Sequence, residues 1–140
     1  GICASAAVRN GLGLKTKIVG VSAGGAPAYA LSFEAKRKVD AQVTTQIADG
    51  MACRVPDEDA LSVIWDNVER MVRVSDDQIR KAMRIYFTDT HNVVEGAGAA
   101  ALAAALRDRE AVAGKRVGVV ASGGNVDHDV FANVLLPGQR

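Results

Sequence analysis

The sequence has few of the features that mark secreted, metal-binding or membrane proteins. It contains only two cysteines, Cys3 and Cys53, which lie far apart with no CxxC pair or Cys/His cluster beside them. This spacing argues against a disulfide framework and a zinc site, and it fits a reducing cytoplasm. The longest uncharged stretch of small and apolar residues, 96–106, is much shorter than the roughly 20 residues that a spanning helix needs. We therefore expect a cytoplasmic protein with no membrane contact.

The charge is nearly balanced, and no linker or repeat interrupts the chain. Lys and Arg number 17 against 16 Asp and Glu, so a net charge of +1 offers no field that would attract nucleic acid or an anionic membrane. With 49% hydrophobic and 24% charged residues, the 140 residues have the composition of one globular unit with one core. We therefore treat 1–140 as a single unit. Because it begins at Gly1 without methionine or a signal-peptide pattern, we expect it to be part of a longer protein.

Helix and strand patterns alternate along the sequence. Apolar spacing, caps and turn residues predict helices over 2–10, 27–37, 59–68, 76–88, 95–107 and 130–135, and strands over 17–21, 71–74 and 116–121. A polar loop without clear periodicity covers 38–50. This order predicts an α/β fold with a parallel sheet and helices on both faces. Ligands of such sheets bind beyond the carboxyl ends of the strands, which here are the segments after Val21, Val74 and Ala121.

Three short motifs are candidate binding elements. Ser122 and two glycines follow the strongest predicted strand, Glu95 begins a predicted helix, and Gly50 ends the polar loop beside Asp49. Each motif also has a purely structural explanation: a tight turn for 122–125, a helix cap for Glu95 and an Asx-type turn for Asp49. From spacing alone these alternatives stay open.

The histidines and the large aromatic residues show no spacing that is typical of a catalytic or binding site. His91 and His128 lie in polar segments with no serine or acidic residue arranged as in a catalytic triad. Trp65 and Tyr86 fall on the apolar faces of predicted helices and are interpreted as core residues. The common nucleotide-binding glycine motifs are absent from the sequence.

Five segments, taken in order, resemble the carboxyl-terminal half of the large domain in the threonine dehydratase and serine racemase family. They are IVGV (18–21), TQIADG (45–50), VSDDQI (74–79), VEGAGA (94–99) and SGGNVD (122–127). The resemblance implies a partial large domain of the tryptophan synthase β-like fold with pyridoxal 5'-phosphate as cofactor. It also implies a lyase that removes water from a hydroxy-amino acid and releases a 2-oxo acid and ammonia.

The resemblance carries roles over to three residues. Ser122 would face the pyridine nitrogen, Glu95 would line the pocket beside the ring, and Gly50 would pack near the cofactor. In the family, the Schiff-base lysine, the asparagine beside the ring hydroxyl and the glycine-rich phosphate loop all lie in the preceding half. We therefore expect no catalytic residue in this chain, no activity of the chain alone, and a missing amino-terminal half as its partner.

The resemblance leaves further properties as expectations. Family members that hold a divalent cation place acidic residues where this sequence has Ser22 and Ala28, so no metal is expected there. A homo-oligomer is implied, whereas the identity of the hydroxy-amino acid and the balance between dehydratase and racemase activity stay open. The alternative is a stand-alone binding or regulatory module of flavodoxin-like design, in which 122–125 and the loop before Gly50 shape a ligand pocket or a partner surface.

Overall fold

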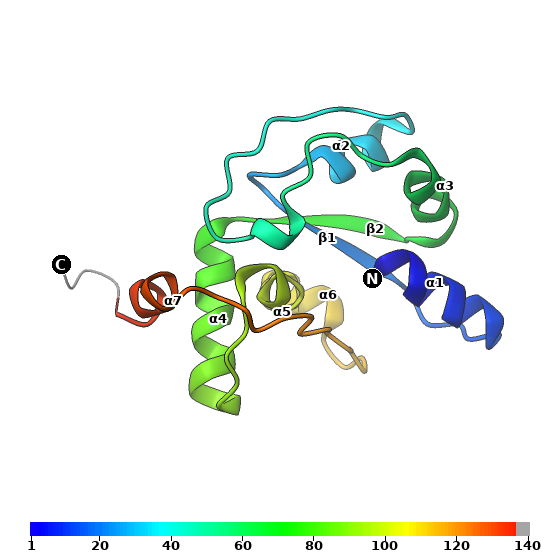
Figure 1. Ribbon diagram of the computed structural model, residues 1–140. Coiled ribbons are helices and arrows are strands. Elements are labelled where there is room, and N and C mark those ends of the chain that lie inside the picture. The colour runs from blue at the N-terminus through cyan, green and yellow to red at the C-terminus, as the bar shows by residue number, and fades with distance from the viewer. Residues whose placement is uncertain (137–140) are drawn as a thin grey trace.

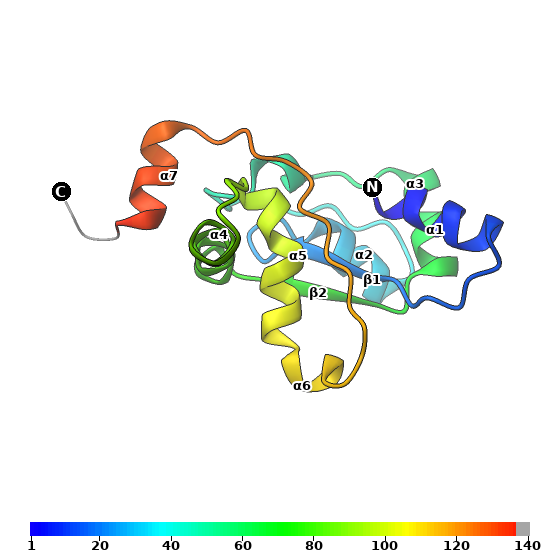
Figure 2. The same cartoon turned by 90° about the horizontal axis from the view of Figure 1, so that it is seen from below.

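Two parallel strands form the centre of the computed structural model, which describes residues 1–136 (Figure 1). Strand β1 (Val19–Ala23) pairs with β2 (Arg70–Val74) in a register that runs from Val19 opposite Arg70 to Ala23 opposite Val74. Helix α2 (Ala28–Ala35) covers one face of this small sheet, and α5 (Gly96–Arg107) covers the other (Figures 1 and 2). The expected parallel α/β arrangement with helices on both faces is confirmed.

The remaining elements surround this centre. They are α1 (Ile2–Gly11), the 3-10 helix η1 (Asp49–Met51), α3 (Glu58–Asn67), α4 (Asp76–Thr90), α6 (Arg109–Val112) and α7 (His128–Leu135). Helix α1 packs on α3 at one end of the sheet, and α4 crosses α5 at the other (Figure 1). Within residues 1–136, no helix combines the length and the apolar character that a bilayer crossing requires.

The core lies between the sheet and the two helices α4 and α5. Ile79 and Met83 of α4 are fully buried against Val72 and Val74 of β2 and against a row of small residues on α5. The buried residues of α5 are Gly96, Gly98, Ala99, Ala100, Ala103 and Ala104. Because these side chains are small, the backbone of α5 can lie close to its neighbours.

Local signals account for the ends of the main helices. Ser75 and Gln78 form a capping box at the start of α4, with each side chain bound to the backbone N–H of the other residue. Asp57 caps α3 by accepting a hydrogen bond from the Ala60 N–H group. Lys36 and His91, with φ of 52° and 57°, end α2 and α4 in the left-handed conformation.

The predicted strand over 116–121 is wrong. Although this segment has the strongest strand pattern, residues 113–122 are exposed and adopt neither helix nor strand. A strand needs a neighbour with which to exchange backbone hydrogen bonds, and the only sheet among residues 1–136 contains β1 and β2 alone. The first strand also begins and ends two residues later than predicted, and the short helix α6 was not predicted.

Candidate functional site

Glu95 lies between two glycines that are far from each other in the sequence. Its backbone N–H group donates a hydrogen bond of 2.9 Å to the carbonyl oxygen of Gly123. A Cβ atom placed on Gly123 would lie 2.4 Å from Oε1 of Glu95, and one placed on Gly50 would lie 3.7 Å from the same oxygen. The fold therefore brings the carboxylate of Glu95 together with both of the other candidate segments, and Ser122 is adjacent to Gly123.

The backbone segments around Glu95 are packed too closely for side chains. A Cβ atom on Gly96 would lie 1.9 Å from the carbonyl oxygen of Ile47, and one on Gly98 would lie 2.8 Å from that of Gly123. Gly124 has the same relation to the carbonyl oxygen of Val93, at 2.7 Å. Each distance is shorter than a carbon–oxygen contact allows, so glycine is required at all three positions.

Ser122 is exposed, and its hydroxyl makes no hydrogen bond with any described residue. It follows the extended segment 116–121 and precedes the glycine that touches Glu95. Its hydroxyl is therefore free to donate to a ligand at the edge of this cradle. We define the cradle as Gly50, Glu95, Gly96, Ser122 and Gly123.

The loop before Gly50 follows a course that was not predicted. Ile47 and Ala48 are buried, and Asp49 and Gly50 begin η1, which packs on α5. Asp49 is exposed, and it starts a turn of 3-10 helix. The close contact between Ile47 and Gly96 was missed because the sequence pattern contains no signal for contacts between loop and helix.

The other candidates lie outside the cradle. His91 ends α4, and His128 is exposed beside Asp129, with 3.0 Å between Nδ1 and Oδ1. Trp65 donates from its indole nitrogen to the carbonyl oxygen of Ser32, as a core residue would. Tyr86 packs against the core, where its hydroxyl is buried without a partner, and burial raises the pKa of that phenol.

Neither residue at the position considered for a cation is charged. Ser22 is buried with its hydroxyl unpartnered, and Ala28 is fully buried at the start of α2. Among the residues that the structure describes, no group of three or more His, Cys, Asp and Glu side chains is arranged to hold a metal ion. Cys3 and Cys53 are both free thiols.

The cradle lies on the side of the sheet toward which both strands run. Gly24 follows β1 and donates from its N–H group to the carbonyl oxygen of Val74 at the end of β2, and the polar loop attaches through Thr44 and Thr45 to Gly25. This is the edge at which open parallel sheets bind their ligands. The fold is that of an α/β domain, and the cradle lies at the carboxyl ends of its strands.

Comparison with known proteins agrees with an α/β domain of this kind and identifies its family. A family model described as "Pyridoxal-phosphate dependent enzyme" matches residues 1–123. The chain is 38% identical over 120 residues to phenylserine dehydratase from Ralstonia pickettii, covering 85% of this chain and 37% of that protein. It is 36% identical over 123 residues to L-threonine ammonia-lyase from Geobacter sulfurreducens, covering 87% and 30%.

Solved structures show the same relationship. The processed form of threonine deaminase isoform 2 from Solanum lycopersicum superposes with a TM-score of 0.85 at 29% identity, covering 95% of this chain and 39% of that one. Maize serine racemase gives a TM-score of 0.84 at 28% identity, covering 94% and 41%. The chain belongs to the pyridoxal-phosphate-dependent enzyme family and has part of its tryptophan synthase β-like fold. It spans about a third of the length of the curated relatives that it matches.

One residue of the cradle, Ser122, has the chemistry that a heteroaromatic cofactor requires. The glycines beside Glu95 hold other parts of the chain close together, because Gly96 lies against the Ile47 carbonyl and Gly123 lies against the Glu95 side chain. The exposed Ser122 hydroxyl is a neutral donor of the kind that a pyridine nitrogen accepts. Pyridoxal phosphate is the cofactor of the family, and the sequence-based expectation of this cofactor is confirmed. The family match favours an enzyme over a flavodoxin-like module.

Proposed function

We propose that this chain forms the ring side of the cofactor site in an ammonia-lyase that removes water from a hydroxy-amino acid, giving a 2-oxo acid and ammonia. The observation that supports it is the position of Glu95 between Gly50 and Gly123, next to the exposed Ser122. The relatives named phenylserine dehydratase and L-threonine ammonia-lyase support the reaction class. In this proposal, residues 1–140 are the carboxyl-terminal part of the catalytic domain.

Ser122 would bind the ring nitrogen and set its protonation. When bound, pyridoxal phosphate supplies an electron sink that weakens bonds at the α-carbon of an amino acid. A serine hydroxyl donates a hydrogen bond to a nitrogen that has no proton, whereas a carboxylate at this position would favour the protonated, more electron-withdrawing ring. With Ser122 as a neutral donor, loss of a β-hydroxyl group would be favoured over transamination, because elimination needs less delocalisation of charge. Ser122 thereby limits transamination as a side reaction.

Glu95 and the glycines would orient the ring. The Glu95 N–H group is bound to the Gly123 carbonyl, which ties the backbone of Glu95 to the turn that contains Ser122. Close packing of Gly96 on Ile47 fixes this part of the backbone against the loop that ends at Gly50. The cradle therefore presents a rigid edge to the cofactor.

The chain alone would not catalyse the reaction. Three of its lysines bind acceptors outside the cradle: Lys17 binds Glu69, Lys38 binds Glu58, and Lys115 donates to the Ala111 carbonyl of α6. The Schiff-base lysine would come from the amino-terminal half of the protein. A cytoplasmic homo-oligomer acting on a hydroxy-amino acid completes the proposal, and the two free cysteines support a reducing compartment.

Substitution of Ser122 tests the proposal in the complete protein that contains these residues. In the Ser122→Asp variant, we expect dehydratase turnover to fall at least about tenfold and the share of transamination product to rise. Product analysis with threonine, serine and phenylserine measures both effects. If turnover and product ratio stay unchanged, Ser122 does not contact the ring nitrogen. The wild-type apoprotein must also bind pyridoxal phosphate in a fluorescence titration, because a failure to bind overturns the cofactor site.

A further inference from the structure

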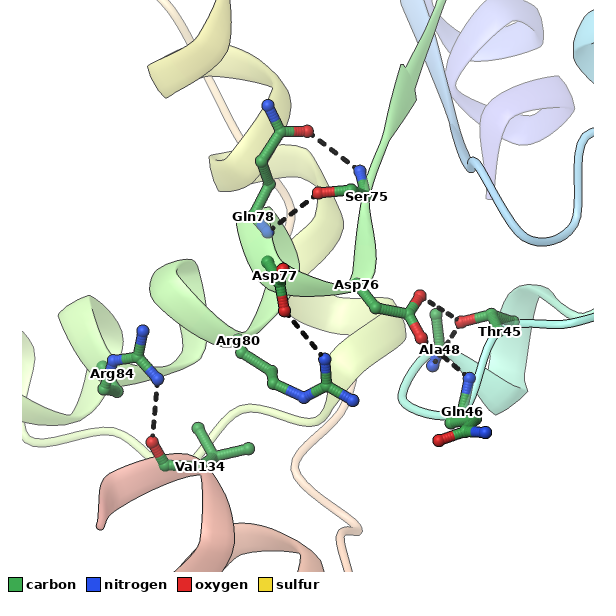
Figure 3. Close-up of polar contacts among 10 residues, drawn as sticks. All are labelled: Thr45, Gln46, Ala48, Ser75, Asp76, Asp77, Gln78, Arg80, Arg84 and Val134. Atoms are coloured by element: carbon green, nitrogen blue, oxygen red, sulfur yellow. Dashed lines mark hydrogen bonds and ion pairs between the residues drawn. The ribbon is translucent and has the colours of Figure 1, made fainter. Parts of the chain in front are cut away.

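A carboxylate outside the cradle is bound to the loop that leads into it. We call residues 43–50 the Thr45 loop. Asp76, the first residue of α4, accepts a hydrogen bond of 2.6 Å from the Thr45 hydroxyl at one oxygen and one of 2.9 Å from the Gln46 N–H group at the other (Figure 3). Both oxygens of the Asp76 carboxylate therefore accept hydrogen bonds from residues that lie 31 and 30 positions away in the sequence.

The Thr45 loop connects Asp76 to the cradle through two further contacts. One residue after Gln46, the Ile47 carbonyl packs on Gly96, and three residues later Gly50 lies beside Glu95. Ile47 is 9% exposed and Ala48 is fully buried, so this stretch cannot move without disturbing the core. The Thr45 hydroxyl also accepts a weaker hydrogen bond from the Ala48 N–H group at 3.3 Å, which tightens the same turn.

The general role of an acidic residue in a first helical turn does not explain this geometry. Asp77 is also in the first turn of α4, where it complements the positive end of the helix as Asp76 does. Its side chain is 95% exposed and pairs with Arg80 at 3.1 Å, on the helix itself (Figure 3). Asp76 differs from Asp77 because it binds the Thr45 loop.

We propose that Asp76 is a positioning residue for the cofactor site. Its carboxylate holds the Thr45 loop so that Ile47 packs on Gly96 and Gly50 stays beside Glu95. The expected effect of Asp76 on cofactor binding rests on the proposed function. The contact between Asp76 and the Thr45 loop does not depend on any ligand. Loss of this contact should loosen the loop first and then weaken the affinity for pyridoxal phosphate.

The experiment compares Asp76→Asn with Asp77→Asn in the complete protein. Both variants remove one negative charge from the same helical turn, but only Asp76→Asn presents an amide group to the donors of the loop. Hydrogen exchange of the peptide over 44–51 and fluorescence titration of the apoprotein with pyridoxal phosphate are the two readouts. For Asp76→Asn we expect exchange to rise about tenfold and the Kd for pyridoxal phosphate to rise about tenfold; for Asp77→Asn both stay within about twofold.

Thr45 supplies the second pair of variants. Thr45→Val removes both the donor to Asp76 and the acceptor of the Ala48 N–H group, so its effects should equal or exceed those of Asp76→Asn. Thr45→Ser keeps the hydroxyl and should retain wild-type exchange and affinity. If Thr45 acted through packing of its methyl group and not through its hydroxyl, serine would not restore the wild-type behaviour. Because valine has nearly the size of threonine, this pair also tests the proposal if Asp76→Asn folds poorly.

The outcomes separate the two proposals. Unchanged exchange in both Asp76→Asn and Thr45→Val overturns the attachment of the loop. Faster exchange with an unchanged Kd overturns the link to the cofactor site and leaves the proposed function standing. If the wild-type apoprotein fails to bind pyridoxal phosphate, the proposed function falls and the positioning role falls with it, even where exchange responds as expected.

Discussion

At the residue scale, the site depends on places where two backbone segments touch. Glu95 donates from its N–H group to Gly123, and Ile47 presents its carbonyl oxygen to Gly96. Such contacts leave no space for a methyl group. A glycine at these positions is therefore a steric requirement, while a glycine in an open segment such as Gly118 is not.

Substitution of Gly96 by alanine should test this requirement. The new methyl group would lie 1.9 Å from the Ile47 carbonyl, so the loop or α5 must shift. We expect a loss of stability of about 1–3 kcal/mol, despite the higher helix propensity of alanine. The midpoint of urea unfolding measures it. Gly118→Ala, where nothing lies within 4 Å of the new atom, is the control and should change stability by less than about 0.5 kcal/mol. Equal effects of the two substitutions would contradict the close contact.

The buried hydroxyl of Tyr86 gives a second prediction at this scale. It has no partner among the described residues, so Tyr86→Phe should leave stability unchanged or raise it by up to about 1 kcal/mol. Burial raises the pKa of Tyr86 above its ordinary value of 10.0, so the unfolded chain loses this proton first as the pH rises. The wild type should therefore lose stability above pH 10 relative to the phenylalanine variant.

Urea unfolding near neutral pH and above pH 10 measures the effect at Tyr86. Tyr29→Phe is the matched control, because the Tyr29 hydroxyl accepts a hydrogen bond from the Asp57 N–H group at 3.2 Å and its removal should lower stability. A phenylalanine variant of Tyr86 that is less stable than the wild type near neutral pH would show that the hydroxyl has a partner.

At the element scale, α4 connects most parts of the domain. Its capping box fixes where it begins, Asp76 in its first turn binds the Thr45 loop, and its middle buries Ile79 and Met83. Toward its end, Arg84 donates to the Val134 carbonyl of α7 at 2.9 Å, and Phe87 meets Phe131 edge to face. The start of α4 therefore affects both the core and the site.

Removal of the cap should destabilise α4 measurably. We expect Ser75→Ala to cost about 1 kcal/mol, because the Gln78 N–H group loses its acceptor at the helix start. The midpoint of urea unfolding measures the loss. Ser62→Ala is the control: Ser62 is an exposed serine inside α3, where alanine is the better helix former, and stability should stay equal or rise slightly. If Ser62→Ala lowers stability as much as Ser75→Ala does, the capping contact makes no specific contribution to stability.

At the scale of the whole molecule, one segment stays outside the core. Residues 113–122 are exposed, and Val117, Val119 and Val120 have exposed fractions of 50%, 38% and 69%. An exposed, valine-rich segment with unpaired backbone groups is a template for pairing with another strand. Within residues 1–136 nothing pairs with it.

The 140-residue chain in isolation should therefore associate with itself. We expect size-exclusion chromatography with light scattering to show dimers or larger species, and Val117→Lys combined with Val119→Lys to reduce them. Val55→Lys, which replaces another exposed valine outside this segment, is the control and should leave association unchanged. A wild-type chain that stays monomeric at all concentrations would contradict this prediction.

The sequence alone was sufficient to predict helix α4 and the protein family. The capping box at Ser75 and the buried spacing of Ile79 and Met83 specify this helix through contacts within a few residues, and the structure has it over 76–90. The motifs over 45–50, 94–99 and 122–127 were sufficient to indicate the family and its cofactor, because their order along the chain is itself specific.

The conformation of the segment 116–121 and the assembly of the cradle could not be predicted from the sequence, because both depend on long-range contacts. A strand pattern states a preference, but the strand forms only where a neighbour completes its hydrogen bonds, and residues 116–121 have none here. Likewise, no local pattern indicates that Glu95 lies between Gly50 and Gly123, or that Asp76 binds Thr45. These contacts join residues distant in sequence, and the packing of α4 and α5 on the sheet creates them.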